Sequence, residues 1–291
     1  MPKRRLDQSA SLTAQFNAWQ RAAESLQRDG LLNDHPSGRF VTNPLLRATL
    51  TSPRLARWGL RLVDRWCAGL HAHIVLRRRV SDDQVRSAAV AGITQVVVLG
   101  AGFDTTSQHL GSSPVTVFEV DAPTTQRAKQ IRMHSSGADG SRLVWVPCDF
   151  EHDDVTTLLL DAGFDTAATA LVVWLGVTYY LTEAALESTL TQLAKLCAPG
   201  SRLLMDYGDP DIVGHHSPRP EVRRVSKSVT RRGEPYRTGM TSVQVDELLA
   251  RHGFQTIEHL RVPDLLGRYD PADARRLAPG DWQAVMTARR V

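Results

Sequence analysis

The residues most suggestive of chemistry lie where a buried strand gives way to a glycine pair and an acid. Residues 95–99 form a short apolar run typical of a parallel strand, and Gly100, Gly102 and Asp104 follow it. Glycine removes the side chain where the backbone must approach a ligand, and it permits positive φ. A dinucleotide fingerprint would carry a third glycine at the position of Thr105. The loop therefore favours a ligand without a diphosphate.

Acids follow the next two predicted strands. The apolar run at 115–120 ends in Asp121, and a strand at 143–146 leads to Asp149. A carboxylate at the end of the second strand can accept hydrogen bonds from both hydroxyls of a ribose. Together with the glycine loop, this suggests a nucleoside-type cofactor, of which S-adenosylmethionine is the commonest without a diphosphate. Either acid could instead cap the helix that follows it.

Composition favours a cytoplasmic globular protein. The hydrophobic fraction of 42% and the charged fraction of 23% are ordinary for that class. Because no run of about 18 apolar residues occurs, we expect no membrane span. The basic start leads into polar sequence, so we expect no secretory signal. Cys67, Cys148 and Cys197 lack metal-ligand spacing, which predicts reduced thiols and no metal site.

Charge is concentrated in the first part of the chain. Residues 1–86 hold 15 Lys and Arg against 7 Asp and Glu, whereas the whole chain carries +4. Such an excess can mark a nucleic-acid partner. No basic stripe interleaved with aromatic residues supports that interpretation, so we favour a solvated arginine-rich surface. A third possibility is that arginines line a pocket for an anionic substrate.

Strands and helices alternate after the first 90 residues, which predicts an α/β fold. We expect a Rossmann-like, seven-stranded, mostly parallel sheet with helices on both faces. The last two strands are too close in sequence for a helical crossover, so we expect an antiparallel pair at the sheet edge. The predicted strands cover residues 95–99, 115–120, 143–146, 167–174, 202–207, 255–261 and 283–289.

The chain divides into a predicted N-terminal helical cap, residues 1–80, and a core, residues 81–291. Residues 54–76 read as one amphipathic helix, and the capping box at 81–84 predicts the start of another. The segment 208–240, rich in Gly, Pro, Arg and His, interrupts the alternation after the fifth strand. We expect it to form a lid over the active site.

These motifs, in order, resemble the leucine carboxyl methyltransferase-like family of S-adenosylmethionine-dependent methyltransferases, in particular its actinobacterial branch. The resemblance implies a class I methyltransferase fold. The matching segments are residues 99–105 (family L-G-A-G-x-D-T), 118–123 ((Y/F)-E-V-D-x-P), 146–150 (V-x-x-D-(L/F)), 174–181 (W-E-G-x-x-x-Y-L), 233–235 with 253–254, and 77–79 before Asp82 and Asp83 (R-x-R…D-D).

The resemblance implies S-adenosyl-L-methionine as the cofactor. It also implies that each motif binds a different part of this molecule. An arginine of the 77–79 cluster would pair with the methionine carboxylate, because a guanidinium matches a carboxylate bidentately. We expect Arg79 in this role, with Arg77 left open. The methionine part would lie over the backbone of Gly100, Ala101 and Gly102, the ribose on Asp121, and the adenine between Asp149 and Phe150.

Acceptor and catalytic residues are less well defined by the sequence. The candidates for binding the acceptor are Trp174, Tyr179, Tyr180, Tyr207 and Arg237. A carboxylate acceptor needs no strong base, whereas a hydroxyl acceptor would use one, with Tyr180, His215 and His216 as weak candidates. Aromatic residues in these positions are as often part of the core, and the two histidines could be plain loop residues.

The predicted function is O-methylation of a small-molecule carboxylate or hydroxyl of the secondary-metabolite type. The N-P-P-Y signature of amino-group methylators is missing after the fourth strand, which favours oxygen. Leu175 stands where many family members carry Glu, and this departure concerns the substrate more than the cofactor. Alternatives are carboxyl methylation of a peptide or protein C-terminus, C-methylation, or a non-catalytic binding protein. We expect a small-molecule partner, no nucleic acid or membrane, and a monomer or homodimer.

Overall fold

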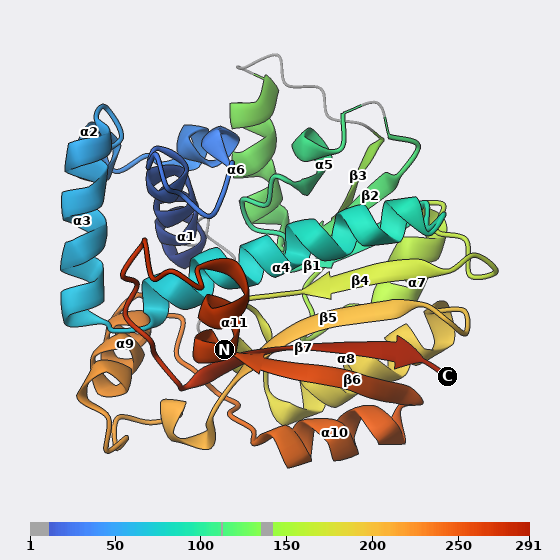
Figure 1. Cartoon of the computed structure of the whole chain (residues 1–291). Helices are drawn as coiled ribbons and strands as arrows, with labels where there is room; N and C mark the ends of the chain where they lie inside the picture. The colour runs from blue at the N-terminus through green and yellow to red at the C-terminus, as the bar shows by residue number, and fades with distance from the viewer. Residues whose placement is uncertain (1–11, 112, 135–141) are drawn as a thin grey trace.

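The computed structural model describes residues 12–111, 113–134 and 142–291 of the chain. Within these ranges, seven strands form one sheet in the order β3-β2-β1-β4-β5-β7-β6 (Figure 1). Residues 1–11 of the predicted cap lie outside the described residues. The strands are β1 (Gln95–Leu99), β2 (Thr116–Asp121), β3 (Leu143–Pro147), β4 (Ala170–Trp174), β5 (Arg202–Gly208), β6 (Phe254–Arg261) and β7 (Gln283–Arg290).

The topology confirms the predicted Rossmann-like α/β fold. Strands β1 to β5 are parallel, and β7 is antiparallel to both β5 and β6. The two closing strands pair as predicted. β7 lies between β5 and β6, and β6 is the edge strand. β4 begins at Ala170 rather than at 167, because Asp165 Oδ1 accepts the amide of Ala167 at 2.9 Å in a preceding turn.

The central strands are apolar on both faces because both faces are covered. Val97 and Leu99 of β1 pack into one core layer, while Val96 and Val98 pack into the other. α7 (Val155–Asp161), α8 (Glu183–Leu196) and α10 (Ser242–Arg251) cover the first layer, and α4 (Leu70–Val90) and α11 (Val262–Tyr269) cover the second. The remaining helices are α1 (Leu12–Ser25), η2 (His35–Phe40), α2 (Pro44–Thr49), α3 (Pro53–Trp66), α5 (Thr106–His109), α6 (Pro123–His134), η3 (Thr178–Tyr180), η4 (Pro210–Ile212) and α9 (Pro220–Arg231).

The helix boundaries predicted around residue 80 are wrong. α4 runs without a break from Leu70 to Val90, so the predicted boundary between cap and core falls inside one helix. Asp82 and Asp83 therefore do not lie at a helix start, as the predicted capping box required. They form ion pairs with Arg78 and Arg79, one turn earlier on the same helix. The single helix predicted for 54–76 is also divided into two. At the break, Gly69 has φ +83°, and a Cβ there would lie 2.2 Å from Gly280 Cα.

The amphipathic stripe predicted on residues 54–76 is largely exposed. Trp58 and Trp66 of α3 are 64% and 59% exposed. The helix packs on α1 through an adjacent side, where Gly59 contacts the Trp19 ring so closely that a Cβ would lie 3.0 Å from Cζ2. Close helix contact at a small residue therefore decides which side of α3 is buried.

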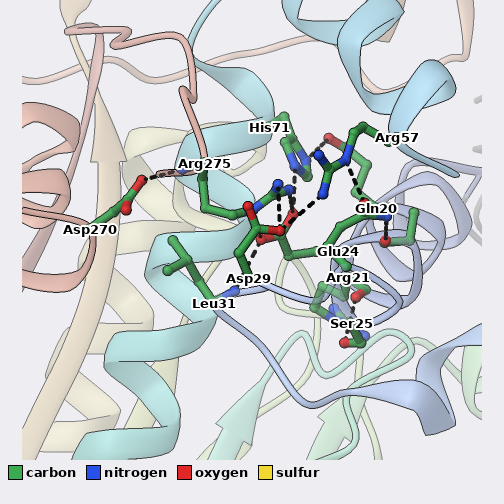
Figure 2. A network of polar contacts seen from close by, with 12 residues as sticks. Gln20, Arg21, Glu24, Ser25, Asp29, Leu31, Arg57, His71, Asp270 and Arg275 are labelled. Carbon is green, nitrogen blue, oxygen red and sulfur yellow. Dashed lines mark hydrogen bonds and ion pairs between the residues drawn. The ribbon is translucent and has the colours of Figure 1, made fainter. Parts of the chain in front are cut away.

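A buried ionic network joins the cap to the C-terminal part of the chain (Figure 2). Glu24 on α1 accepts hydrogen bonds from Arg275 Nη2 at 2.6 Å and Nε at 2.9 Å, and its Oε2 lies 3.4 Å from His71 Nε2 on α4. Burial alone would raise the pKa of Glu24, but the hydrogen bonds from His71 and Arg275 outweigh it and lower the pKa to about 2. Glu24 is therefore ionised and fully paired.

We expect Glu24→Gln to lower the free energy of unfolding by about 3–5 kcal/mol, because it leaves the buried guanidinium of Arg275 without its main counter-charge. Glu187→Gln is the matched control: Glu187 pairs with Arg251 at an exposed site, where the expected loss is about 1 kcal/mol or less. Urea denaturation followed by circular dichroism measures both. Equal losses in the two variants would contradict the structural role of the network.

Candidate active site

A cavity of about 590 Å³ lies at the carboxyl ends of the central strands. It is lined by the loops after β1, β2, β3 and β4, at residues 100–104, 121–125, 148–151 and 175–177. The strand order reverses between β1 and β4, and ligands of open α/β sheets bind at such switch points. The volume is in the usual range for a small-molecule site.

The turn after β1 takes a backbone conformation that needs glycine. Gly100 and Gly102 have φ +63° and +51°. A Cβ at Gly100 would lie 2.2 Å from Val177 Cγ2, so the loops after β1 and β4 touch at this point. The turn therefore depends on both the positive φ and the missing side chain.

The same turn closes over the carboxylate of Asp121 at the end of β2. The amide of Gly102 donates to Oδ2, and the amide of Ala122 donates to Oδ1 at 2.6 Å. Burial raises the pKa of Asp121 to about 6, although these two hydrogen bonds lower it. Each carboxylate oxygen can accept more than one hydrogen bond, so Asp121 can still accept donors from a ligand in the cavity.

Arg78 and Ser81, on α4, each carry a buried polar atom close to the cavity. Arg78 Nη1 donates to Asp104 Oδ2 at 2.6 Å, and Nε pairs with Asp82 at 2.9 Å. Its Nη2, like the hydroxyl of Ser81, is buried and has no hydrogen-bond partner among the described residues. Both residues line the cavity. A buried donor without a partner costs free energy, so these atoms fit an anionic or polar ligand group.

Thr105 stands where a dinucleotide fingerprint would carry its third glycine. Its hydrogen bond connects the glycine turn to the N-terminal cap. Its hydroxyl donates at 2.7 Å to Oδ1 of Asp34, which is fully buried. Arg21 on α1 pairs with Asp34 at 2.8 Å and donates to the carbonyl of Phe103 at 2.6 Å. Burial opposes ionisation of Asp34, but the charge of Arg21 and other donors hold its pKa well below the ordinary value.

Asp206 on β5 fixes the other side of the cavity, and sequence reasoning missed it. Its Oδ2 accepts a hydrogen bond from Arg77 Nη1 at 2.7 Å and lies 3.1 Å from His73 Nε2. Its Oδ1 accepts the amide of Gly176, in the loop after β4, at 2.7 Å. Arg77 also donates to the hydroxyl of Tyr179 at 2.8 Å. The sequence signal that could have identified Asp206 is the presence of an acid within an otherwise apolar strand.

The structure brings most predicted cofactor residues together. They come from the ends of three neighbouring strands, as the sequence pattern predicted. Of the acceptor candidates, Tyr180 and Arg237 reach the same cavity. The predicted cofactor residues that line it are Gly100, Ala101, Gly102, Asp121, Asp149 and Phe150.

Arg79 requires a correction, because it does not line the cavity. Its side chain is 40% exposed, donates to the carbonyl of Leu31 at 3.2 Å and lies over the Tyr269 ring. Successive residues of a helix point about 100° apart, so only part of the arginine cluster on α4 can face the sheet. Arg77 and Arg78 occupy that side.

Other predicted residues also lie away from the main cavity. Trp174 is fully buried in the core, and Tyr207 is paired with His259 at 3.0 Å. His215 is paired with Ser226 at 3.1 Å, and neither it nor His216 is among the cavity-lining residues described. The predicted lid does reach the cavity, through residues 233–235 and Arg237.

Two kinds of site are absent from the part of the chain that the structure describes. No group of three or more His, Cys, Asp or Glu side chains in that part of the chain is arranged to hold a metal ion. None of the helices described is both long and apolar enough to cross a bilayer.

Comparison with known proteins agrees with this geometry. The chain is 32% identical over 180 residues to the "Putative S-adenosyl-L-methionine-dependent methyltransferase YktD" of Bacillus subtilis, covering 60% of this chain and 59% of the relative. A Parafrankia protein of the same description is 34% identical over 197 residues, covering 67% and 62%. The chain thus spans about three fifths of the length of these curated relatives.

Solved structures support the fold. A DUF574 family protein from Streptomyces avermitilis superposes with a TM-score of 0.60 at 18% identity, over 82% of this chain and 92% of the other. The sheet is that of the class I methyltransferases, as predicted. The sequence model of the leucine carboxyl methyltransferase family matches residues 14–194, more than half of the chain. The chain therefore belongs to the leucine carboxyl methyltransferase family.

Proposed function

We propose that the protein is an S-adenosyl-L-methionine-dependent methyltransferase that methylates an oxygen of a small-molecule carboxylate or hydroxyl. The observation that carries this proposal is the glycine turn closed over Asp121 inside a cavity at the sheet's switch point. Family membership and the names of the relatives support the same cofactor. A carboxylate beneath a glycine turn fits the two hydroxyls of a ribose.

Three parts of the cofactor would have a partner in this arrangement. Asp121 would accept hydrogen bonds from the ribose, and Asp149 and Phe150 would flank the adenine. The unpartnered Nη2 of Arg78 fits the methionine carboxylate, so we assign that role to Arg78 in place of Arg79. When bound, the cofactor supplies a methyl group on a sulfonium, which is an excellent leaving group.

The chain's own task is then to align the acceptor oxygen and to exclude water. Tyr180 is the predicted catalytic candidate that lines the cavity. Burial raises the pKa of Tyr180 well above its ordinary value, so the phenol keeps its proton and donates hydrogen bonds. It is therefore a poor base. This favours a carboxylate acceptor, which needs no base, over a hydroxyl.

We expect Asp121→Asn to weaken S-adenosylhomocysteine binding by about 1–3 kcal/mol, because a charge-assisted contact with the ribose is lost. Isothermal titration calorimetry measures the affinity. Arg79→Ala is the control and should bind as the wild type does, since Arg79 lies outside the cavity. Unchanged affinity in Asp121→Asn would refute the ribose contact, and no binding to the wild type would refute the function.

Affinity for S-adenosylhomocysteine should also depend on pH. Hydroxyl donors favour the ionised form of Asp121, and the pKa of this carboxyl is raised to about 6 in the free protein. Affinity should therefore be constant above about pH 7 and fall by up to about tenfold per pH unit below 6.

Asp121→Asn is also the control for this pH dependence. Burial raises the pKa of the neighbouring Glu119 to about 7, so a second group titrates close by. If Asp121 carries the effect, the pH dependence of binding disappears in the variant. A wild-type affinity that rises as the pH falls would contradict the assignment.

A further inference from the structure

A second, smaller cavity of about 90 Å³ adjoins the first. The two cavities share five lining residues, which we call the seam: Thr13, Asn17, Ile74, Arg77 and Tyr180. A ligand group at the seam therefore lies within reach of both spaces.

The small cavity is built by elements added to the sheet. Its walls come from α1, the first turns of α4, η3 and α9, together with Cys67, Arg232 and Tyr236. The large cavity, in contrast, is lined mainly by the loops after strands β1 to β4. The cap and the segment 208–240 thus shape the small cavity.

The walls of the small cavity are aromatic and aliphatic. The rings of Tyr179, Tyr180 and Tyr236 contact one another, with centroids 4.9–5.2 Å apart. Phe16, Leu70 and five further residues complete this lining with aliphatic, aromatic or small polar groups: Cys67, Ile74, Val225, Ser228 and Val229. Such a surface favours a compact apolar group.

The two cavities differ in the charged residues that line them. Arg77 and Arg232 line the small cavity, and no acidic residue is among the described residues that line it. The large cavity has both signs of charge, with five acids and four arginines: Asp104, Asp121, Asp149, Glu151 and Glu234, and Arg21, Arg77, Arg78 and Arg237. Asp206 balances the charge of Arg77 from outside the lining, but the small cavity itself presents no acid that would repel an anion.

Hydrogen-bond donors gather at the seam. Thr13, Asn17, Arg77 and Tyr180 each carry a donor, and Tyr180 keeps its proton at neutral pH. The hydroxyl of Thr13 is buried and has no partner in the described part of the chain. Four donors beside an apolar pocket match a carboxylate attached to an apolar body.

We propose that the small cavity holds the body of the methyl acceptor, an apolar carboxylic acid about the size of an aryl group, with its carboxylate at the seam. This rests on the proposed function. A carboxylate oxygen uses a lone pair to bond the methyl carbon while the carbon–sulfur bond breaks and its electron pair stays on sulfur. The products are a methyl ester and S-adenosylhomocysteine, and no proton is released.

Calorimetry of the full chain with benzoate and phenylacetate tests the proposal, with benzamide and phenylacetamide as neutral probes of matched shape. Each probe is titrated with and without saturating S-adenosylhomocysteine. We expect at least one acid to bind at least tenfold more tightly than its amide. Equal affinity of acid and amide, or no binding of any probe at millimolar concentration, would overturn the proposal.

Two substitutions on α9 test whether the acid binds in the small cavity. Ser228→Phe places a ring in the small cavity, whereas Thr230→Phe places the same ring on the exposed side of the helix. We expect Ser228→Phe to weaken acid binding at least tenfold and Thr230→Phe to leave it unchanged. S-adenosylhomocysteine should bind both variants normally. Acid binding that survives in Ser228→Phe would place the acceptor elsewhere.

Failure of the proposed function has a different signature. If S-adenosylhomocysteine does not bind the wild type, the methyltransferase assignment fails, while the titrations without it still decide whether the pocket takes carboxylates. With a labelled methyl donor, a carboxylate acceptor gives a base-labile product that releases methanol. A base-stable product from a binding acid would overturn the carboxylate assignment alone.

Discussion

The closure of the glycine turn over the Asp121 carboxylate is the interaction on which the functional end of the sheet depends. A half-buried carboxylate needs donors for the lone pairs that water cannot reach, and the amides of Gly102 and Ala122 supply them. The turn can reach this position because Gly100 has no Cβ to collide with Val177. The ends of β1, β2 and β4 therefore fix one another's positions.

Two buried carboxylates extend this constraint outward. Asp34 joins the turn to α1 through Thr105 and Arg21, and Asp206 joins the loop after β4 to α4 through Arg77. Burying such charges costs free energy that pairing only offsets, so their net contribution to stability is small. Their effect is to fix geometry. The cap is consequently a structural part of the site, continuous with the core through α4.

The two cavities are lined largely by different elements of the fold. The larger space is made mainly by strand ends, whose arrangement follows from the parallel sheet itself. The smaller, aromatic space is made by α1, the first turns of α4, η3 and α9, and of these α1 and α9 contribute no residue to the two core layers of the sheet. Leu175 adds an apolar patch to the wall of the larger space where many family members carry an acid. In the proposed function, the larger space is the donor site and the smaller one holds the acceptor.

The sequence alone determined the strands, the glycine turn and the acids at the strand ends. These are local patterns, and parallel strands bring their carboxyl ends to one edge whatever surrounds them. Tertiary structure decided which arginine of residues 77–79 faces the cavity, because that depends on which side of α4 packs on the sheet. It also decided the burial of α3 and the partners of Asp34 and Asp206, because these contacts join residues far apart in the chain, and no local pattern encodes them.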